Sequence, residues 1–314
     1  MHIRKVSVVI PMYQNATSAI ALVNALRNQR GPQNVETEII VIDDGSGDDS
    51  SDRVEAAVGA LATMCKLSKN HGRAAARNHA AAKANGDVIL FVDCDCLPAG
   101  GDLIVQHLRR WTDGVVASIG PVQGDGRGFW HRYQSDASER RARQHAAGID
   151  YSGSSQNMMV ARWAFNKCGG FDSLYRAYGF EDRDLQIRLS ALGQIAWTYG
   201  GAVRHVDALS LRTVSKKMLE AGEHSSTRFA GAHPEAYRAL GYASLDVRQR
   251  SWLRLPAMLA DTFCDALARL GDAFLGSRLI PYGVKRTYVR AITGISYLAG
   301  TARALRSGSE ALST

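Results

Sequence analysis

Residues 87–95 are Asp87-Val88-Ile89-Leu90-Phe91-Val92-Asp93-Cys94-Asp95, an apolar run that ends in two aspartates at alternate positions. A short run rich in β-branched and aromatic residues predicts a buried strand. Successive side chains of a strand point to opposite sides, so Asp93 and Asp95 are expected on one face and Cys94 and Cys96 on the other. This strand is therefore predicted to end in a pair of carboxylates.

Two further apolar runs precede it. Val6-Ser7-Val8-Val9-Ile10 stops at Pro11, and residues 38–42 stop at Asp43-Asp44-Gly45-Ser46. Strands that alternate with helical segments predict βαβ units and a mainly parallel sheet, whose ligands bind at the carboxyl ends of the strands. The polar residues after the three runs are therefore expected to form one site. The segments of helical composition between the runs are 16–29, 52–64 and 73–85.

The next part of the chain is less regular. Residues 120–128 are predicted to form a loop and 135–147 a helix. Leucines at helical spacing predict a helix over 181–192, with Glu181 and Asp182 in its first turn. The other predicted elements are strands over 157–160, 194–198 and 202–206 and a short helix over 163–168.

The basic charge is concentrated near the C-terminus. Of the formal net charge of +8, the stretch 248–306 supplies nearly all, with ten basic residues against three acidic ones. It has neither a reader motif nor a basic face rich in stacking aromatics, so no nucleic-acid partner is expected. The five scattered cysteines form no disulfide framework and favour a reducing compartment, which with the absence of a recognisable signal peptide predicts a cytoplasmic protein.

Two apolar series in the region 251–314 predict amphipathic helices. Their interpretation stays open between packing on the rest of the chain, a homodimer contact and attachment to an anionic membrane surface, for example at the inner face of the cell membrane. No apolar run reaches the ~20 residues of a membrane-spanning helix. The first series is Leu255, Leu259, Phe263, Leu267, Leu270 and Phe274, and the second is Val284, Tyr288, Ile292, Ile295, Leu298 and Leu305.

The Asp93/Asp95 pair predicts a site for Mg²⁺ or Mn²⁺ shared with phosphate oxygens, because these ions prefer oxygen ligands. A solvated acidic turn is one alternative. A Cys-x-Cys zinc site is another, although it lacks a second ligand pair. The Asp43-Asp44 pair could be part of a turn or could accept hydrogen bonds from a base or ribose. Arg77 could likewise be only a surface charge on an alanine-rich helix.

Five motifs in order resemble those of family 2 glycosyltransferases with the GT-A fold, over roughly residues 5–208. The resemblance implies a Rossmann-like, mainly parallel sheet sandwiched by helices, with a helical C-terminal extension. It also implies a catalytic domain over 1–208, with a donor-binding half over about 1–120 and an acceptor-binding half over about 121–208. A mobile linking segment is then expected over 209–250. The motifs are Val8-Val9-Ile10-Pro11-Met12-Tyr13-Gln14-Asn15, Val41-Ile42-Asp43-Asp44-Gly45-Ser46, Asn70 to Asn78, Phe91-Val92-Asp93-Cys94-Asp95 and Gly179-Phe180-Glu181-Asp182.

By this resemblance, Asp95 would ligate the metal, with Asp93 nearer the ribose and the metal. His205 would be a further metal or diphosphate contact, although a histidine after a strand is often structural. Asp182 would be the catalytic base, and Glu181 would bind the acceptor or orient that base. The residues assigned to the nucleotide are Pro11, Tyr13, Asp43, Asp44, Asn70, Arg77 and Asp93.

The expected function is inverting transfer of a sugar from a nucleotide-diphosphate sugar, with UDP favoured, to a hydroxyl of a glycan or lipid-linked acceptor. One base opposite the leaving group implies in-line attack, whereas hydrolases flank the bond with two carboxylates. A sugar-phosphate nucleotidyltransferase is an alternative, but no glycine-rich phosphate loop follows the first strand. A non-catalytic binding protein is the other alternative, which intact acidic motifs disfavour.

Overall fold

The computed structural model describes residues 2–310, and these form two compact units. Unit 1 comprises Met1–Leu174 and Asp182–Asp207, and unit 2 comprises Tyr175–Glu181 and Ala208–Thr314. The main division therefore falls beside the boundary predicted at residue 208. Residues 311–314 of the predicted C-terminal region lie outside the described residues.

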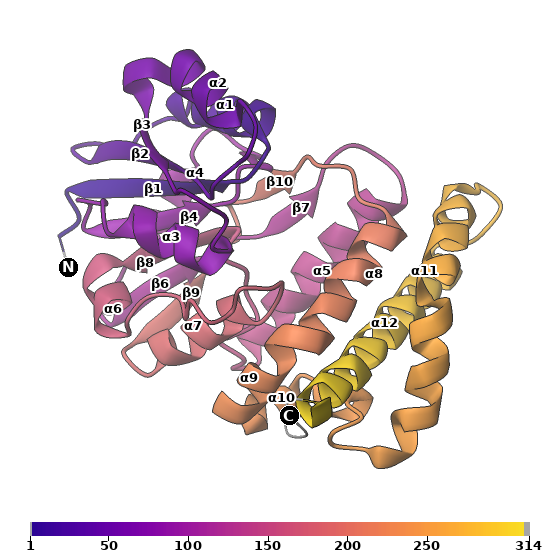
Figure 1. The fold of residues 1–314 in the computed structure, drawn as a ribbon. Helices are drawn as coiled ribbons and strands as arrows, with labels where there is room; N and C mark the ends of the chain where they lie inside the picture. Colours follow the sequence, from indigo (N-terminus) through magenta and orange to yellow (C-terminus); the bar gives the residue numbers. More distant parts are fainter. Residues whose placement is uncertain (1, 311–314) are drawn as a thin grey trace. The chain divides into compact units, whose positions relative to one another are not determined.

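Unit 1 contains a seven-stranded sheet in the order β3-β2-β1-β4-β8-β6-β9 (Figure 1). Every neighbouring pair is parallel except the two that involve β8, which runs antiparallel to β4 and to β6. The expectation of an α/β fold with a mainly parallel sheet is confirmed. The strands are β1 (Lys5–Met12), β2 (Glu36–Asp43), β3 (Thr63–Lys66), β4 (Val88–Val92), β6 (Val115–Ile119), β8 (Asn157–Ala161) and β9 (Gln194–Trp197).

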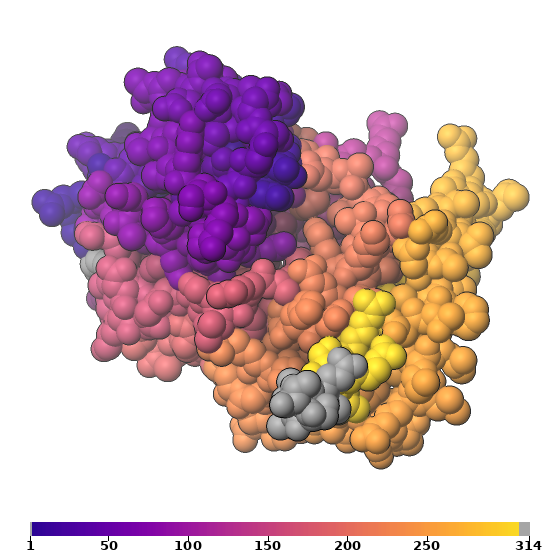
Figure 2. Space-filling view, viewed as in Figure 1, coloured from indigo at the N-terminus to yellow at the C-terminus, as the bar shows by residue number. Residues whose placement is uncertain are grey.

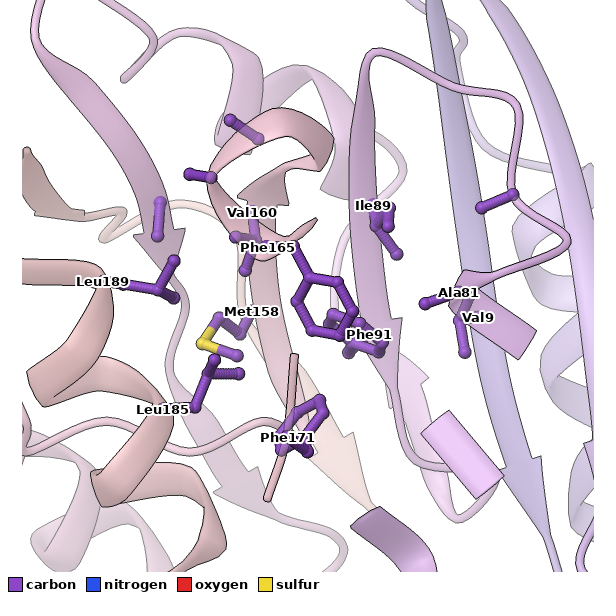
Figure 3. Packing of buried hydrophobic residues seen from close by; sticks show 14 of the residues in the cluster. Val9, Ala81, Ile89, Phe91, Met158, Val160, Phe165, Phe171, Leu185 and Leu189 are labelled. Carbon is purple, nitrogen blue, oxygen red and sulfur yellow. The ribbon is translucent and has the colours of Figure 1, made fainter. Parts of the chain in front are cut away.

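Helices cover both faces of this sheet. Alternate residues of β1 point to opposite sides, with Val8 in the cluster under α1, α2 and α4 and Val9 in the cluster under α3, α6 and α7. In the second cluster, Phe91 of β4 packs edge-on against Phe171, with ring centroids 5.2 Å apart (Figure 3). The helices are α1 (Ala16–Arg27), α2 (Ser50–Val58), α3 (Arg73–Ala81), α4 (Leu103–Leu108), α6 (Arg162–Lys167) and α7 (Glu181–Ser190).

A second, three-stranded sheet in unit 1 has the order β5-β10-β7. In its central strand, β10 (Val203–His205), His205 is paired with Cys96 of β5 (Cys96–Pro98) and with Gly124 of β7 (Val122–Gly124). Helix α5 (Phe129–Ala146) lies against β7, and His131 donates from Nδ1 to the Gly124 carbonyl over 2.8 Å. This sheet brings residues after position 202 beside the residues that follow β4.

Three predicted helices have clearly different limits in the structure. The helix predicted over 73–85 ends at Ala81. The helix predicted over 52–64 ends at Val58, because Gly59 has a φ of +49° that breaks the helix, and a 3₁₀ turn (Gly59–Leu61) and β3 follow. The helix predicted over 135–147 begins earlier, at Phe129, after Gly128 with a φ of +107°.

Unit 2 is helical. The segment 209–250, predicted to be a mobile link, contains helices α8, α9 and α10.

Within unit 2, the turn that follows α8 is in backbone contact with α12. The contact is made at Gly222 and Gly300, since a Cβ on Gly222 would meet the Tyr297 carbonyl oxygen. The elements of unit 2 are α8 (Leu211–Glu220), a π-helical turn (Ala221–Ser225), α9 (Ser226–Ala232), α10 (Pro234–Ala239), 3₁₀ turns at Tyr242–Leu245 and Ser251–Leu253, α11 (Arg254–Gly276) and α12 (Tyr282–Glu310).

The packing face of α11 is not the large apolar stripe seen in the sequence. The helix contacts α8 and α12 through small residues, of which Gly271 lies against Leu211 and Tyr288. Most of the large apolar residues are exposed instead. The buried residues of α11 are Ala257, Ala260, Cys264, Ala268, Gly271 and Leu275.

Within residues 2–310, no helix is long and apolar enough to cross a membrane. All five cysteines are free thiols.

Candidate active site

The loops that follow β1 and β2 are joined through Asp43. Its Oδ1 accepts hydrogen bonds from Ser46 N (3.0 Å) and Ser46 Oγ (2.5 Å), and its Oδ2 accepts one from Ser51 Oγ (2.6 Å). Ser46 Oγ in turn accepts a bond from Gln14 N over 2.7 Å. Asp43 therefore fixes the chain where β1 and β2 end. Ser46 and Ser51 were not singled out from the sequence, because serine in such a segment is ordinary turn composition.

Asp44 holds the loop that precedes α3. Its carboxylate accepts bonds from His71 N (2.8 Å) and Gly72 N (3.0 Å), and burial raises its pKa even though these bonds lower it. Asn70 Oδ1 also accepts a bond from Gly72 N, over 3.1 Å. Gly45, with a φ of +71°, packs directly on the backbone of Lys69, where a Cβ would collide. The motifs at 43–46 and 70–78 are thus parts of one structure.

The other two residues assigned to the nucleotide lie at the end of β1. Pro11 is the penultimate residue of this strand and is paired with Ile42. Tyr13 follows the strand and is 47% exposed, so its ring is available to a ligand. Both residues therefore lie beside the loop that Asp43 holds.

Arg77 is buried, so its interpretation as a surface charge is wrong. Only 1% of the residue is exposed, and its guanidinium Nη2 lies 2.6 Å from Asp93 Oδ1. The guanidinium also lies 5.3 Å from the centre of the Phe171 ring. A buried arginine that is bonded to a carboxylate restricts where that carboxylate can point. Arg77 thereby orients Asp93 at the end of β4.

Asp95 lies against His205. Their Oδ2 and Nε2 atoms are 3.2 Å apart, and Val206 N donates to the Asp95 carbonyl over 2.8 Å. The side chain of Asp95 is 21% exposed and that of His205 is 8% exposed, so the pair has access to solvent through the carboxylate. The small sheet that pairs His205 with Cys96 therefore explains why a residue so distant in sequence reaches Asp95.

The chemistry of these donors fits Mn²⁺ or Mg²⁺ better than zinc. The carboxylate oxygens of Asp93 and Asp95 suit both ions. Burial raises the pKa of Cys94 and Cys96 well above the ordinary thiol value, which disfavours the thiolate form that a zinc site needs. In the part of the chain that the structure describes, no three His, Cys, Asp or Glu side chains gather as a metal site. A metal here would need ligands from a bound molecule.

Asp182 lies in the first turn of α7 and is held by two hydroxyls. Its Oδ1 accepts a bond from Ser155 Oγ (2.5 Å) and its Oδ2 accepts one from Ser154 Oγ (3.3 Å). Gln186, one turn along α7, accepts a bond from Gly153 N over 2.9 Å. The N-terminal end of a helix also favours a carboxylate. Nothing in the sequence around the two serines distinguishes them from other loop residues, so the sequence alone does not predict their role.

The antiparallel strand β8 brings Asp182 to the edge where the other acids lie. Val92, the last residue of β4, is paired with Asn157, the first residue of β8. Ser154 and Ser155 precede β8, so they lie at the carboxyl end of β4, the end that carries Asp93. Gln156 spans this edge, since its amide Nε2 is 3.8 Å from Cys96 Sγ.

Glu181 belongs to unit 2. It is buried, with 3% exposed, and follows Phe180, whose φ of +71° is unusual for a residue with a side chain. The Phe180 ring stacks on Phe229, with centroids 4.8 Å apart, and Tyr178 N donates to Glu220 over 3.0 Å. Packing in unit 2 therefore stabilises the strained backbone just before Glu181.

Comparison with known proteins gives one consistent result. The sequence pattern of the family described as Glycosyl transferase family 2 matches residues 7–171. The chain is 27% identical over 179 residues to an undecaprenyl-phosphate 4-deoxy-4-formamido-L-arabinose transferase of Serratia proteamaculans, covering 56% of this chain and 49% of that protein. It is 31% identical over 250 residues to a pre-mycofactocin glycosyltransferase of Mycobacterium tuberculosis, covering 74% of this chain and 49% of that protein. The chain thus spans about half the length of these relatives.

Among solved structures, the fold resembles a mannosyltransferase of Pyrobaculum calidifontis in complex with GDP-Man and Mn²⁺. The TM-score is 0.62 at 19% identity, and the match covers 97% of this chain and 88% of the other. At this identity the likeness establishes the fold.

Proposed function

This chain belongs to glycosyltransferase family 2, and on that premise we propose that it transfers a sugar from a nucleotide-diphosphate sugar to a hydroxyl of a glycan or lipid-linked acceptor. A UDP-sugar is the favoured donor. One observation carries the proposal: the acidic residues of the motifs lie at the same edge of the unit 1 sheet. They are Asp43 and Asp44 after β2, Asp93 after β4, Asp95 with its partner His205, and Asp182. Such an edge is where α/β sheets bind their ligands.

On the donor side, the nucleotide would lie over the ends of β1, β2 and β4. Tyr13 offers an exposed ring for the base, and the buried carboxylates of Asp43 and Asp44 fix the loops around it. Each carboxylate keeps further acceptor capacity for a base N–H or a ribose hydroxyl. Asn70 and Pro11 complete the walls of this proposed pocket.

Asp95, His205 and Asp93 would hold Mn²⁺ or Mg²⁺ together with the donor diphosphate. Such an ion stabilises the negative charge that develops on a departing nucleoside diphosphate. Arg77 contributes by keeping the Asp93 carboxylate in place. Mn²⁺ bound with GDP-Man to the Pyrobaculum mannosyltransferase supports this assignment.

Asp182 would be the general base. A sugar hydroxyl is a weak nucleophile at neutral pH, and a positioned carboxylate that accepts its proton lowers the barrier. The hydroxyls of Ser154 and Ser155 orient both Asp182 oxygens. With one base opposite the leaving group, attack is in line and the anomeric configuration inverts. Glu181, buried in unit 2, is proposed to orient this base or to bind the acceptor.

Two single substitutions test these roles. Asp182→Asn should lower kcat by about 10²–10⁴-fold with donor binding retained, because the amide cannot accept the proton. Asp95→Asn should weaken donor binding and the response to added Mn²⁺. The assay is release of nucleoside diphosphate from a panel of nucleotide sugars with and without Mn²⁺. Asp52→Asn, which changes a carboxylate in a surface ion pair with Lys66, is the matched control. Near-normal turnover in either site variant would remove its assigned role.

The C-terminal helices also bear on where the enzyme works. The basic C-terminal helices favour a cytoplasmic protein held peripherally at the inner face of the cell membrane, where a lipid-linked acceptor would be available. A homodimer contact through the same helices is the alternative.

A further inference from the structure

The outward side of α11 is a continuous apolar surface. Large side chains recur along it at helical spacing, and most are more than half exposed; Figure 2 includes this part of unit 2 in space-filling form. Over 23 residues the helix is about 35 Å long. The exposed side chains are Leu255 (68%), Met258 (57%), Leu259 (57%), Phe263 (55%), Leu267 (36%) and Leu270 (70%), and Trp252 (68%) precedes them.

This surface is not left over from poor packing. Helix α11 is anchored to α12 by the Tyr288 hydroxyl, which donates to the Leu267 carbonyl over 2.9 Å, and by contact of Phe274 with the Tyr288 ring at 4.9 Å. Its side toward α8 and α12 consists mainly of alanine, cysteine and glycine. Small residues let the helices approach closely, and the large residues point away. Contiguous exposed apolar surface of this kind is typical of an interaction site.

The charges around this surface favour an anionic partner. Exposed arginines lie at both ends of α11, with Arg254 at its start and Arg278 just beyond its end, and Leu279 beside Arg278 is 94% exposed. The acidic residues of this region are bonded inside unit 2. Asp261 pairs with Arg303 (2.7 Å) and Arg306 (2.5 Å), Asp265 pairs with Arg212 (2.9 Å) and Arg269 (2.7 Å), and Asp272 accepts a bond from Leu211 N (2.5 Å).

We propose that the outward face of α11 is the membrane-docking surface of this protein, lying in the interface of an anionic lipid leaflet. The apolar side chains enter the acyl region, and the arginines at the helix ends contact lipid phosphates. In a symmetric dimer the same face would meet a copy of itself and bring like charges together, which disfavours a second copy as the occupant. The inference deepens the proposed function by assigning its membrane contact to one helix.

Vesicle binding tests this surface on the full-length protein. Wild type should bind phosphatidylethanolamine–phosphatidylglycerol vesicles, and should bind phosphatidylcholine vesicles more weakly. The double substitution Leu259→Gln/Phe263→Gln should lower the partition coefficient by about tenfold or more, since two exposed apolar side chains no longer leave water. Arg254→Gln/Arg278→Gln should weaken binding to the anionic vesicles and leave binding to phosphatidylcholine unchanged. The matched control is Leu174→Gln/Trp163→Gln, which removes a leucine and an aromatic exposed elsewhere, at 62% and 48%.

Three results would overturn the assignment. They are absence of vesicle binding by wild type, equal binding by the Leu259/Phe263 variant, and a dimer of wild type in sedimentation that this variant abolishes. Donor hydrolysis with Mn²⁺ should be the same in wild type and in all three variants, which shows that each is folded. If hydrolysis is absent from wild type while the vesicle results hold, the proposed transferase activity fails and the docking surface stands.

Discussion

At the scale of single residues, each charge of the site is fixed by a specific neighbour. Asp93 is bonded to the buried Arg77, Asp95 lies against His205, and Asp182 is bonded to two serine hydroxyls. A carboxylate that must receive a proton or share a metal works only in a defined orientation, and these contacts supply it. Asp93 and Asp95 are recognisable from the sequence because they follow an apolar strand, and Asp182 because it lies in the motif Gly179-Phe180-Glu181-Asp182 at the start of a predicted helix. The residues that bond to these acids, above all Ser154 and Ser155, can be identified only from the folded structure.

His107 is the buried residue whose chemistry gives a pH prediction. Its Nε2 is 2.9 Å from Asn157 Oδ1, and its Nδ1 is 2.7 Å from Ser118 Oγ. Asn157 uses its amide nitrogen to donate to the Pro121 and Gly201 carbonyls, so its Oδ1 must accept from His107. The imidazole therefore carries a proton on Nε2. Burial lowers its pKa from 6.5 to about 4, so the folded protein holds it neutral at pH 7.

This shift should make the stability of unit 1 depend on pH. Between pH 6.5 and pH 4 the unfolded chain binds a proton that folded His107 does not, so the contribution is present above pH 6.5 and is lost as the pH falls. From pH 7.5 to pH 5, His107 should account for a loss of about 2 kcal/mol in the free energy of unfolding. Urea unfolding followed by tryptophan fluorescence measures it, and His107→Gln should show a correspondingly smaller loss. Equal losses in the two proteins would contradict the prediction.

At the scale of elements, α12 and the end of α8 are in backbone contact at Gly300. A Cβ at this position would meet the Leu219 carbonyl oxygen and lie 2.9 Å from Glu223 N. Gly300→Ala should therefore lower the free energy of unfolding by about 1–3 kcal/mol, because the helices must separate. Gly294→Ala, in the same helix, should raise it by about 0.5–1 kcal/mol, since its nearest neighbour is Leu245 Cδ1 at an ordinary 3.4 Å. Thermal denaturation followed by circular dichroism compares them, and similar midpoints for both variants would show that the contact is not tight.

The elements also show what sequence patterns can predict. Strands β1, β2 and β4 are identifiable because each contains a buried run of apolar or small residues, which in β2 is limited to its second half. Acidic residues mark the ends of β2 and β4. Strand β3 is not recognisable from the sequence, because it has only four residues, none of them fully buried, and is separated from α2 only by a short 3₁₀ turn. For α11, hydrophobic periodicity correctly predicts an amphipathic helix but leaves open which side packs. Alanine and glycine can form the packed face of a close helix pair, and periodicity gives them little weight.

The sequence predicts which acids form the site but not how they are arranged in space. Five motifs in order indicate its acids, but the position of Asp182 relative to Asp93 depends on β8. An antiparallel strand in a mainly parallel sheet brings the start of β8 to the end of β4, and no local pattern in Asn157-Met158-Met159-Val160-Ala161 specifies its direction. Strand direction is a property of the connections between elements.

At the scale of the whole molecule, the chain crosses between its two units at residues 174–175, 181–182 and 207–208. Arg77, Asp95 and Asp182 lie in unit 1, whereas Glu181 and the outward face of α11 belong to unit 2. Donor binding is therefore expected to be a property of unit 1, and membrane binding a property of unit 2. The two activities should be separable by single-site substitutions.

Ligand-induced stabilisation measures the donor-binding half of this division. UDP with Mn²⁺ at about 100 times its dissociation constant should stabilise the folded state by about 2.7 kcal/mol and raise the melting temperature of unit 1 by about 5–10 °C. Because Asp95 is proposed to share the metal with the diphosphate, Asp95→Asn or a chelator should abolish most of the increase. Asp182→Asn should retain it, since the base does not contact UDP, and so should Leu259→Gln/Phe263→Gln. If the increase in melting temperature persists without Mn²⁺ and in Asp95→Asn, the diphosphate binds without this metal site. If the increase is lost in Asp182→Asn, that residue acts in donor binding instead of proton transfer.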